Sequence, residues 1–478
     1  MLSCALMRRR SHVLSGRAAH VLAPMTNLSA AAALPPLRLV RGQGIVVSDE
    51  SGRDYIEAMS GLWCAGLGWA NEELIEAATA QMRSLSYYHG FADRRVPVVE
   101  QLASTLIQKA PPQLRSGKIF FGQSGSDAND TQVRLIWCYN HARGKPEKRN
   151  FISRERGYHG VTVAAGSLTG LPYVHGGSVG SGLPLDFVTH VSAPHYHRNA
   201  RPGESEAAFV TRLADELEAE ILRRGPHTVA GFLAEPLQGA GGVIIPPVGY
   251  HAAMREVCER HDVLLMGDEV ITGLGRTGHF WGCETPGIDQ TPDLISCAKQ
   301  LTSAYLPLSA TFVPQFIIDA LDDATKRSGM VFGHGYTYSG HPVACAVALK
   351  VLEIYERDHI LDSVKTTLGP HFQTRLRALA DAHPSLIGDV RGVGMIGAIE
   401  LEADTAARRQ YPSEAGAAAL VAKLALGRGL IVRPLPGDAV AVCPPLISTE
   451  AQIDEIFDRL HESLDDAERE LVHWKERV

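Results

Sequence analysis

The chain has 478 residues, of which 45% are hydrophobic and 21% charged, and its formal net charge at pH 7 is −7. This length predicts two domains, or one large α/β domain with a smaller lobe. No basic excess is present to neutralise phosphates, which argues against a nucleic-acid partner, and no apolar run of about 18 residues is present that could span a membrane.

The eight cysteines indicate whether disulfides or a metal site are expected, and the composition of the N-terminus indicates whether a targeting segment is present. No cysteine forms a CxxC motif or stands at zinc spacing from a histidine, so we predict reduced thiols and no metal. The first 48 residues contain six arginines and no acid, as a mitochondrial transit peptide would. The alternative is a flexible extension over residues 1–17 of a cytoplasmic protein, which we favour.

In chain order, residues 44–58 predict a small hairpin that turns at 49–52. Strand-like apolar runs and helical stretches then alternate from about residue 72 to 330. Strands are predicted at 118–121, 228–234, 263–266, 294–298 and 308–313, and helices at 127–139 and 250–260. This alternation predicts a mostly parallel sheet covered on both faces. A helix over 343–356 leads into a smaller α+β region.

Polar side chains follow four of the predicted strands. The loop from Gly122 to Asp127 follows the first, Glu235 the second, Asp268 the third and Lys299 the fourth. Ligands of open α/β sheets bind beyond the carboxyl ends of the strands, so we expect these groups to converge.

The segment Ser124-Gly125-Ser126 stands between a strand and a helix. With Ser126 as N-cap, the free N–H groups of the first turn and two hydroxyls make an anion site. The segment lacks the lysine of a P-loop, so a nucleoside triphosphate is not predicted. Simple helix capping is the alternative interpretation.

Lys299 and Asp268 each end a buried strand. Loss of hydration there lowers the pKa of a lysine and prepares its amine for Schiff-base chemistry. A buried carboxylate needs a cationic partner, and a pyridinium nitrogen would serve. The alternatives are a lysine that reaches the surface and a structural ion pair, but the combination of loop, acid and lysine favours the catalytic reading.

The segment Gly273–Gly278 fits the pattern G-x-G-x-x-G of dinucleotide-binding loops. No helix is predicted after it, and no acid ends a following strand about 20 residues on. Dinucleotide binding is therefore not predicted.

Several motifs together resemble the class III, or ω-, aminotransferases, and most of all their ω-amino acid:pyruvate and amine:pyruvate branch. They are FGQSGSDAND at 121–130, GYHG at 157–160, EPLQGAGG at 235–242, DEVITGLGRTG at 268–278, Lys299, and YTYSGHP at 336–342. The resemblance runs from about Ala18 to the C-terminus. It implies an α/β fold of PLP fold type I, pyridoxal 5′-phosphate as cofactor, amine and keto-acid substrates, and a homodimer or tetramer with shared active sites.

The resemblance also implies domains and cofactor contacts. Residues 18–71 and 336–478 would form the small lobe, and residues 72–335 the large, cofactor-binding domain. Lys299 and Asp268 would be catalytic. The cofactor-binding positions would be Ser124, Gly125, Ser126, Tyr158, His159, Glu235, Asp268, Val270, Lys299 and Thr337. Gly125 and Ser126 would bind the phosphate, Tyr158 and Val270 the two ring faces, and Thr337 the phosphate of the neighbouring subunit.

The implied substrate pocket draws on distant positions. They are Met25, Trp63, Phe91, Tyr158, Ala240 and Arg433. Core packing is the alternative for Met25, Trp63 and Phe91. The sequence departs from the family pattern in four places. Met25 stands where an aromatic is common, Asp127 replaces Glu, Gln300 replaces Gly, and the stretch from Arg433 to Asp438 is one residue longer.

The implied reaction is a ping-pong transfer of an amino group to a keto acid, with pyruvate expected. Lys299 would hold the cofactor and then move a proton as general base and acid, while Arg433 would bind the substrate carboxylate. Other class III branches stay open as alternatives, namely diaminopelargonate, ornithine and 4-aminobutyrate aminotransferases and aminomutases. A non-catalytic binding protein on the same fold is a more distant one.

Overall fold

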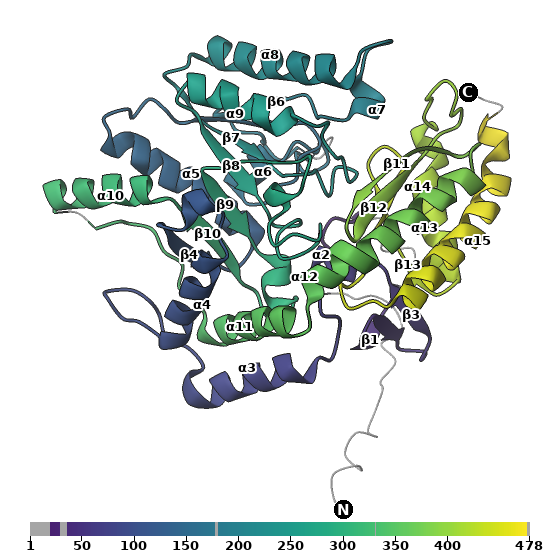
Figure 1. Cartoon of the computed structure of the whole chain (residues 1–478), viewed down its shortest axis with the longest axis horizontal. Helices are drawn as coiled ribbons and strands as arrows, with labels where there is room; N and C mark the ends of the chain where they lie inside the picture. The colour runs from purple at the N-terminus through teal and green to yellow at the C-terminus, as the bar shows by residue number, and fades with distance from the viewer. Residues whose placement is uncertain (1–19, 29–35, 177–179, 330, 476–478) are drawn as a thin grey trace, which may run out of the picture.

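The computed structural model describes residues 20–28, 36–176, 180–329 and 331–475. Figure 1 shows a large domain on one side and a small domain on the other, with the N-terminal hairpin beside the small domain. The extension predicted over residues 1–17 lies outside the described residues. In the part of the chain that the structure describes, no helix is both long and apolar enough to cross a bilayer.

Seven strands within the described residues form the central sheet of the large domain, in the order β4-β10-β9-β8-β7-β5-β6. Their bounds are β4 (Lys118–Gly122), β5 (Asn150–Arg154), β6 (Val188–Val191), β7 (Val229–Ala234), β8 (Leu264–Asp268), β9 (Leu294–Cys297) and β10 (Ser309–Val313). Strand β10 pairs antiparallel with both neighbours, and the other pairs are parallel. The predicted mostly parallel sheet is confirmed.

Helices cover both faces of this sheet because its strands are apolar on both sides. Phe232 and Leu265 pack against α8 and α9, whereas Leu233 and Met266 face α5. The helices are α3 (Glu72–Leu85), α4 (Pro97–Gln108), α5 (Gly125–Ala142), α6 (Val163–Leu168), α8 (Glu206–Arg224), α9 (Tyr250–Arg260), α10 (Gln315–Ser328) and α11 (Pro342–Arg357). Figure 1 shows α8 and α9 at the top of the large domain and α3 and α11 at its bottom.

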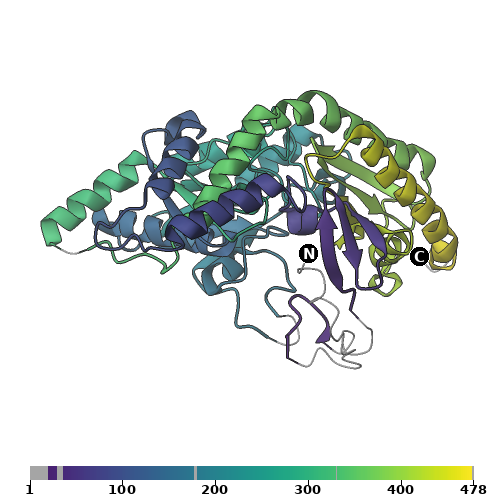
Figure 2. The same ribbon diagram turned by 90° about the horizontal axis from the view of Figure 1, so that it is seen from below.

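The small domain combines the two ends of the chain. Its sheets are β1-β2-β3-β13 and β11-β12-β15-β14. Their bounds are β1 (Leu39–Gln43), β2 (Val46–Asp49), β3 (Asp54–Glu57), β11 (Ile387–Val393), β12 (Ile396–Leu401), β13 (Leu430–Ile431), β14 (Arg433–Leu435) and β15 (Ala439–Val442). The predicted hairpin is confirmed as β2 and β3, and β13 joins it in parallel, so the N-terminal hairpin is tied to the C-terminal part. Figure 2 shows this hairpin beside the C-terminal helices.

The sheet β11-β12-β15-β14 separates the outer helices from the large domain. Ile399 and Val442 lie in the cluster that includes α13 (Gly369–Ala382), α14 (Ala417–Gly427) and α15 (Glu450–Lys475). Ala398 and Ala441 face the other way and pack with Trp63 and Leu237. Trp63, one of the predicted substrate positions, therefore lies where the two domains meet.

Short helices complete the described structure. They are α2 (Ser60–Trp63), α7 (Tyr196–Asn199), α12 (Ile360–Ser363), η1 (Pro112–Leu114), η3 (Gly282–Glu284), η4 (Lys299–Thr302), η5 (Val364–Leu368) and η6 (Ser413–Ala415). Helix α11 packs against α3 and α4. The domain limits after residues 17, 71 and 335 stay predictions.

Candidate active site

The groups expected at the strand ends do converge. Strands β4, β7, β8 and β9 open on one cavity of about 340 Å³, which Ser124, Glu235, Asp268 and Lys299 line from four different loops. The reason is topological, because β7, β8 and β9 run parallel, and β10, antiparallel to both β4 and β9, brings the carboxyl end of β4 to the same edge.

The N-cap of α5 differs from the prediction. Ser124, not Ser126, caps the helix: its Oγ accepts from the N–H of Asp127 at 3.2 Å, and Asp127 Oδ1 accepts from the N–H of Ser124 at 3.1 Å. The helix therefore begins at Gly125, two residues earlier than predicted. The departure at Asp127 is explained in part, since this shorter acid closes the capping box and also accepts from Ser309 Oγ at 2.9 Å.

The first turn of α5 packs closely against its neighbours. A Cβ on Gly125 would lie 2.9 Å from the methyl groups of Val270, and one on Gly160 would lie 2.4 Å from Ser126 Oγ. Ser126 Oγ accepts from the N–H of Val161 at 3.2 Å. Gly125 and Ser126 line the cavity, so the positive end of the helix dipole faces it and favours an anion.

Asp268 is buried at the end of β8 and held from three sides. Its Oδ2 accepts from Asn129 Nδ2 and lies within hydrogen-bond distance of His159 Nδ1, both at 2.8 Å, and its Oδ1 accepts from the N–H of Val270 at 3.0 Å. Because residues two apart on a strand point to the same face of the sheet, Asp268 lies on the face of Met266, toward α5. Sequence reasoning missed Asn129, although it stands within the motif at 121–130 on the buried face of α5.

Glu235 is also buried, and its carboxylate holds two backbone N–H groups in place. Its two carboxylate oxygens accept from the N–H of Tyr158 at 3.1 Å and of Gly239 at 2.9 Å. Burial raises the pKa of this carboxyl above its usual range. The side chain thereby joins the loop of Tyr158 to the loop that carries Ala240.

Lys299 stands between two cavities. It follows β9 with a backbone φ of +46°, an uncommon conformation for a residue with a side chain. Together with Tyr158 it lines both the cavity already described and a second one of about 910 Å³. Within the described ranges, no hydrogen bond or salt bridge engages its ammonium.

The larger cavity brings together five of the six predicted substrate positions, namely Met25, Trp63, Tyr158, Ala240 and Arg433. Trp63 is only 1% exposed, so it both packs in the core and lines the cavity, whereas Met25 is 61% exposed. Arg433 begins β14. Among the described residues its guanidinium has no hydrogen-bond or salt-bridge partner.

Tyr173 is a lining residue of the larger cavity that sequence reasoning missed. Burial raises the pKa of its hydroxyl, and the charge of Arg433 opposes that shift, so the two side chains lie near each other. The same balance holds for Tyr158. Tyr173 stands in a loop without a recognisable motif, which left no signal in the sequence.

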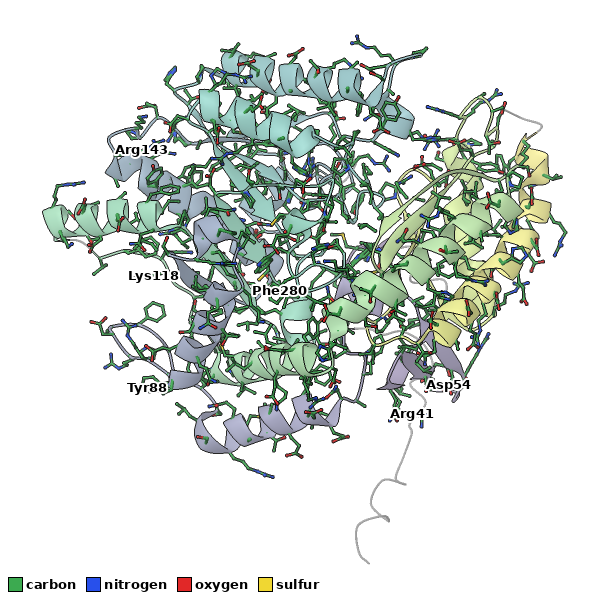
Figure 3. The ribbon with its side chains drawn as sticks, in the orientation of Figure 1. Arg41, Asp54, Tyr88, Lys118, Arg143 and Phe280 are labelled. Carbon is green, nitrogen blue, oxygen red and sulfur yellow. The ribbon has the colours of Figure 1, made fainter. Side chains whose placement is uncertain are left out.

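Two predicted site residues do not line either cavity as described. Phe91 is 48% exposed on the loop between α3 and α4, and Thr337 lies in the turn before α11. The hydroxyl of Tyr87 donates to the backbone oxygen of Thr337 at 2.7 Å, which joins the two segments. Figure 3 shows Tyr88 of the same loop on the side of the large domain away from the small domain.

Comparison with known proteins decides the family. The family model of class III aminotransferases matches residues 28–464. The chain belongs to this family. A solved ω-transaminase from Pseudomonas jessenii in complex with PMP superposes on this class III aminotransferase with a TM-score of 0.89 and 44% identity, covering 94% of this chain and 97% of that one.

Related sequences agree with this assignment. The uncharacterized aminotransferase y4uB of Sinorhizobium fredii is 42% identical over 438 residues, 91% of this chain and 92% of that protein. The mitochondrial gamma-aminobutyrate transaminase 1 of Oryza sativa subsp. japonica is 40% identical over 457 residues, 96% of this chain and 86% of that protein.

This class III aminotransferase is a transaminase of PLP fold type I and uses pyridoxal 5′-phosphate. The smaller cavity fits that group. It offers the open first turn of α5 to a phosphate, the buried Asp268 carboxylate to a pyridine nitrogen, and the Lys299 amine to an aldehyde.

The departure at Gln300 has a structural role. Its Nε2 donates to the backbone oxygen of Gly273 at 3.1 Å, and its Oε1 accepts from Arg276 at 3.2 Å. The buried Arg276 also donates to the backbone oxygens of Met395 and Pro444. The segment Gly273–Gly278 is thus a packed loop that ties the turn at Lys299 to the small domain.

Proposed function

We propose that this enzyme moves an amino group from an ω-amino acid or an amine to a keto acid, with pyruvate as acceptor, in a ping-pong reaction. One observation carries the proposal: Lys299 lines both the cofactor cavity and a larger cavity that contains Arg433, a cation with no partner among the described residues. An amine and a keto acid can use that cavity in turn.

The residues of the smaller cavity would hold the cofactor, which supplies an electron sink when bound. Ser124, Gly125 and Ser126 would bind its phosphate at the start of α5. The Asp268 carboxylate, held by His159 and Asn129, would keep a proton on the ring nitrogen.

Tyr158 and Val270 would contact the two ring faces, and Glu235 would lie on the hydroxyl side. The free Lys299 Nζ would act first as general base, which takes the proton from the amine-bearing carbon of the substrate. It would then act as general acid, which gives that proton to the cofactor.

Arg433 would bind the carboxylate of the keto acid that accepts the amino group. A guanidinium binds a carboxylate through two parallel hydrogen bonds, and Arg433 has no competing acid to release first. Its position in a cavity with the exposed Met25 leaves room for an amine without a carboxylate. Two kinds of substrate can therefore share the site.

Names of relatives support an ω-amino acid as donor. One relative is named gamma-aminobutyrate transaminase and one solved neighbour ω-transaminase. We therefore place 4-aminobutyrate beside simple amines among the donors to test first. Plant relatives are named mitochondrial, whereas we keep the cytoplasm as the proposed compartment of this chain.

A homodimer would complete the site. The aromatic side chains of Tyr88, Phe91 and Tyr338 are 43%, 48% and 52% exposed, and they lie on the two segments that the bond from Tyr87 joins. Such a patch is typical of an interface. From there Thr337 would reach the phosphate, and Phe91 the substrate, in a second copy of the chain.

The test is a half-reaction screen. Purified enzyme with bound cofactor is mixed with each amine, and the visible absorbance band of the cofactor is followed. The aminated enzyme is then mixed with pyruvate or 2-oxoglutarate. The proposal expects ω-amino acids to convert the band and pyruvate to restore it. Restoration by 2-oxoglutarate alone, or conversion only by ornithine or diaminopelargonate, would assign another branch.

The dimer has its own test. Thr337→Val should weaken cofactor retention, and the chain should sediment as a dimer or tetramer. A fully active monomer would contradict this part of the proposal.

A further inference from the structure

Two arginines cross the boundary between the domains in opposite directions. Arg156, just after β5 in the large domain, donates from Nη2 to the backbone oxygen of Pro436 at 2.7 Å. Arg391 of β11, in the small domain, donates from Nε to the backbone oxygen of Gly242 at 2.8 Å. The loops that they hold carry Arg433 and Ala240, which both line the larger cavity.

Arg156 is built into this position. Its Nη1 lies 2.9 Å from His195 Nδ1, which must accept because a guanidinium only donates. Its backbone φ is +62°. A Cβ on Gly242 would lie 3.1 Å from Arg156 Nη2, and one on Gly437 would lie 2.9 Å from the same atom. Glycines on both loops therefore let the side chain pass between them.

The charges around the crossing point are compensated. Arg391 lies 2.6 Å from Asp389 Oδ2 and 2.7 Å from Glu400 Oε2, and Arg198 of α7 pairs with Glu400 as well. Figure 1 shows α7 of the large domain close to β11. Buried charges are tolerated only when they are paired in this way.

Arg433 stands apart from this network. It begins the same loop but has no hydrogen-bond or salt-bridge partner among the described residues, and it lines the larger cavity together with Tyr158 and Tyr173. The far end is held at Pro436, whereas the near end is left open to a ligand.

We propose that Arg156 is a positioning residue, which sets the place of Arg433 in the cavity by holding Pro436. The inference rests on the proposed role of Arg433 as carboxylate ligand. The stretch from Arg433 to Asp438 ends in a turn, with a backbone φ of +76° at Gly437 and +52° at Asp438, and an unanchored turn has conformations to lose on binding. An anchor at Pro436 removes that freedom in advance, so more of the charge-pair energy appears as affinity.

The experiment compares Arg156→Met with the parent enzyme. Methionine keeps an unbranched apolar stem but removes the donors. We expect the KM for pyruvate to rise about tenfold, as for loss of one charge-assisted hydrogen bond, while the half-reaction with 1-phenylethylamine changes by less than about threefold. Hydrogen exchange of residues 432–438 should become faster. Arg156→Lys, which keeps one donor, should restore part of both effects.

Two controls separate positioning from general stability. Arg198→Met removes a cation from the same network without touching the loop, and should leave the KM for pyruvate unchanged. In an Arg433→Ala background, Arg156→Met should add no further rise in KM, because the two residues act through one contact.

Several results would overturn the proposal. They are unchanged exchange and KM in Arg156→Met, an equal KM rise in Arg198→Met, or full additivity with Arg433→Ala. If Arg433→Ala by itself leaves the KM for pyruvate unchanged, the proposed role of Arg433 fails. Hydrogen exchange of residues 432–438 then still reports whether Arg156 holds the loop. Should Arg156→Met not fold, the same comparison is made with Arg156→Lys.

Discussion

The smaller cavity is lined mostly by residues that follow strands of one sheet, whereas the larger cavity takes its lining from parts of the chain as distant as residues 22–28 and 416–438. In the smaller one, the acids Asp268 and Glu235 are buried and hydrogen-bonded. In the larger one, Arg433 has no partner among the described residues and Met25 is exposed. We interpret the smaller cavity as a site whose polar groups are held in place before its one resident group binds. In the larger cavity, which two substrates would use in turn, the Arg433 guanidinium is left to bind a carboxylate.

The largest effect is expected from the residue that the cavities share. Lys299→Ala removes the proposed cofactor anchor and proton carrier, so kcat should fall by more than the factor of about 10²–10⁴ that one acid–base group contributes. Steady-state turnover measures it, and Lys118→Ala at the exposed first residue of β4 is the matched control. Turnover within tenfold of the parent would show that Lys299 is misassigned.

Asp268→Asn tests the smaller cavity. It removes the negative charge and turns an amide donor toward groups that now donate to Asp268, so kcat should fall about 10²–10³-fold. The control is Asp293→Asn, a carboxylate at the opposite end of the sheet that pairs with Arg255 at 2.8 Å. That variant should lose stability but keep kcat. Near-parental kcat in Asp268→Asn would refute its pairing with the ring nitrogen.

Arg433→Ala tests the larger cavity. We expect the KM for pyruvate to rise about 10–100-fold, while the half-reaction with 1-phenylethylamine is spared, because only the acid offers a carboxylate. Stopped-flow measurement of each half-reaction separates the two. Arg428→Ala, at a half-buried arginine of the small domain that pairs with Asp466, is the control. Equal effects on both half-reactions would mean that another cation binds the carboxylate.

The smallest effect concerns the segment that joins the cavities. Glu57 accepts from the N–H of Gly61 at 2.6 Å beneath Leu62, which lines both cavities. Burial raises the pKa of Glu57 from 4.5 to about 7. The folded state thus binds this proton more tightly than the unfolded state, and the free energy of unfolding falls as pH rises from 4.5 through about 7.

Glu57→Gln cannot ionise and should escape that fall. At pH 8 the variant should be more stable than the parent by about 2–3 kcal/mol, and at pH 4 the two should be alike. Urea unfolding at several pH values measures this, with Glu50→Gln on the exposed hairpin turn as control. An equal pH dependence in parent and Glu57→Gln would exclude Glu57 as the titrating group.

Much of the large domain was predictable because its signals are local. An apolar run followed by a polar group marks a strand end, and the helix over 250–260 was predicted to the residue. The start of α5 was misplaced because two serines compete for the cap, and only the bond between Ser124 and Asp127 distinguishes them. Strand β1 was missed, since its pairing with β2 leaves no clear alternation in the sequence.

The sequence by itself determined which polar groups line the smaller cavity, because the order and type of Asp268, Lys299 and the serine loop follow from short segments. Only the tertiary structure decided that Arg433 and Met25 share a cavity. It also decided that Arg156 meets Pro436, 280 residues away. Such contacts depend on how two domains pack, and packing is set by the whole core, so no local pattern along the chain records it.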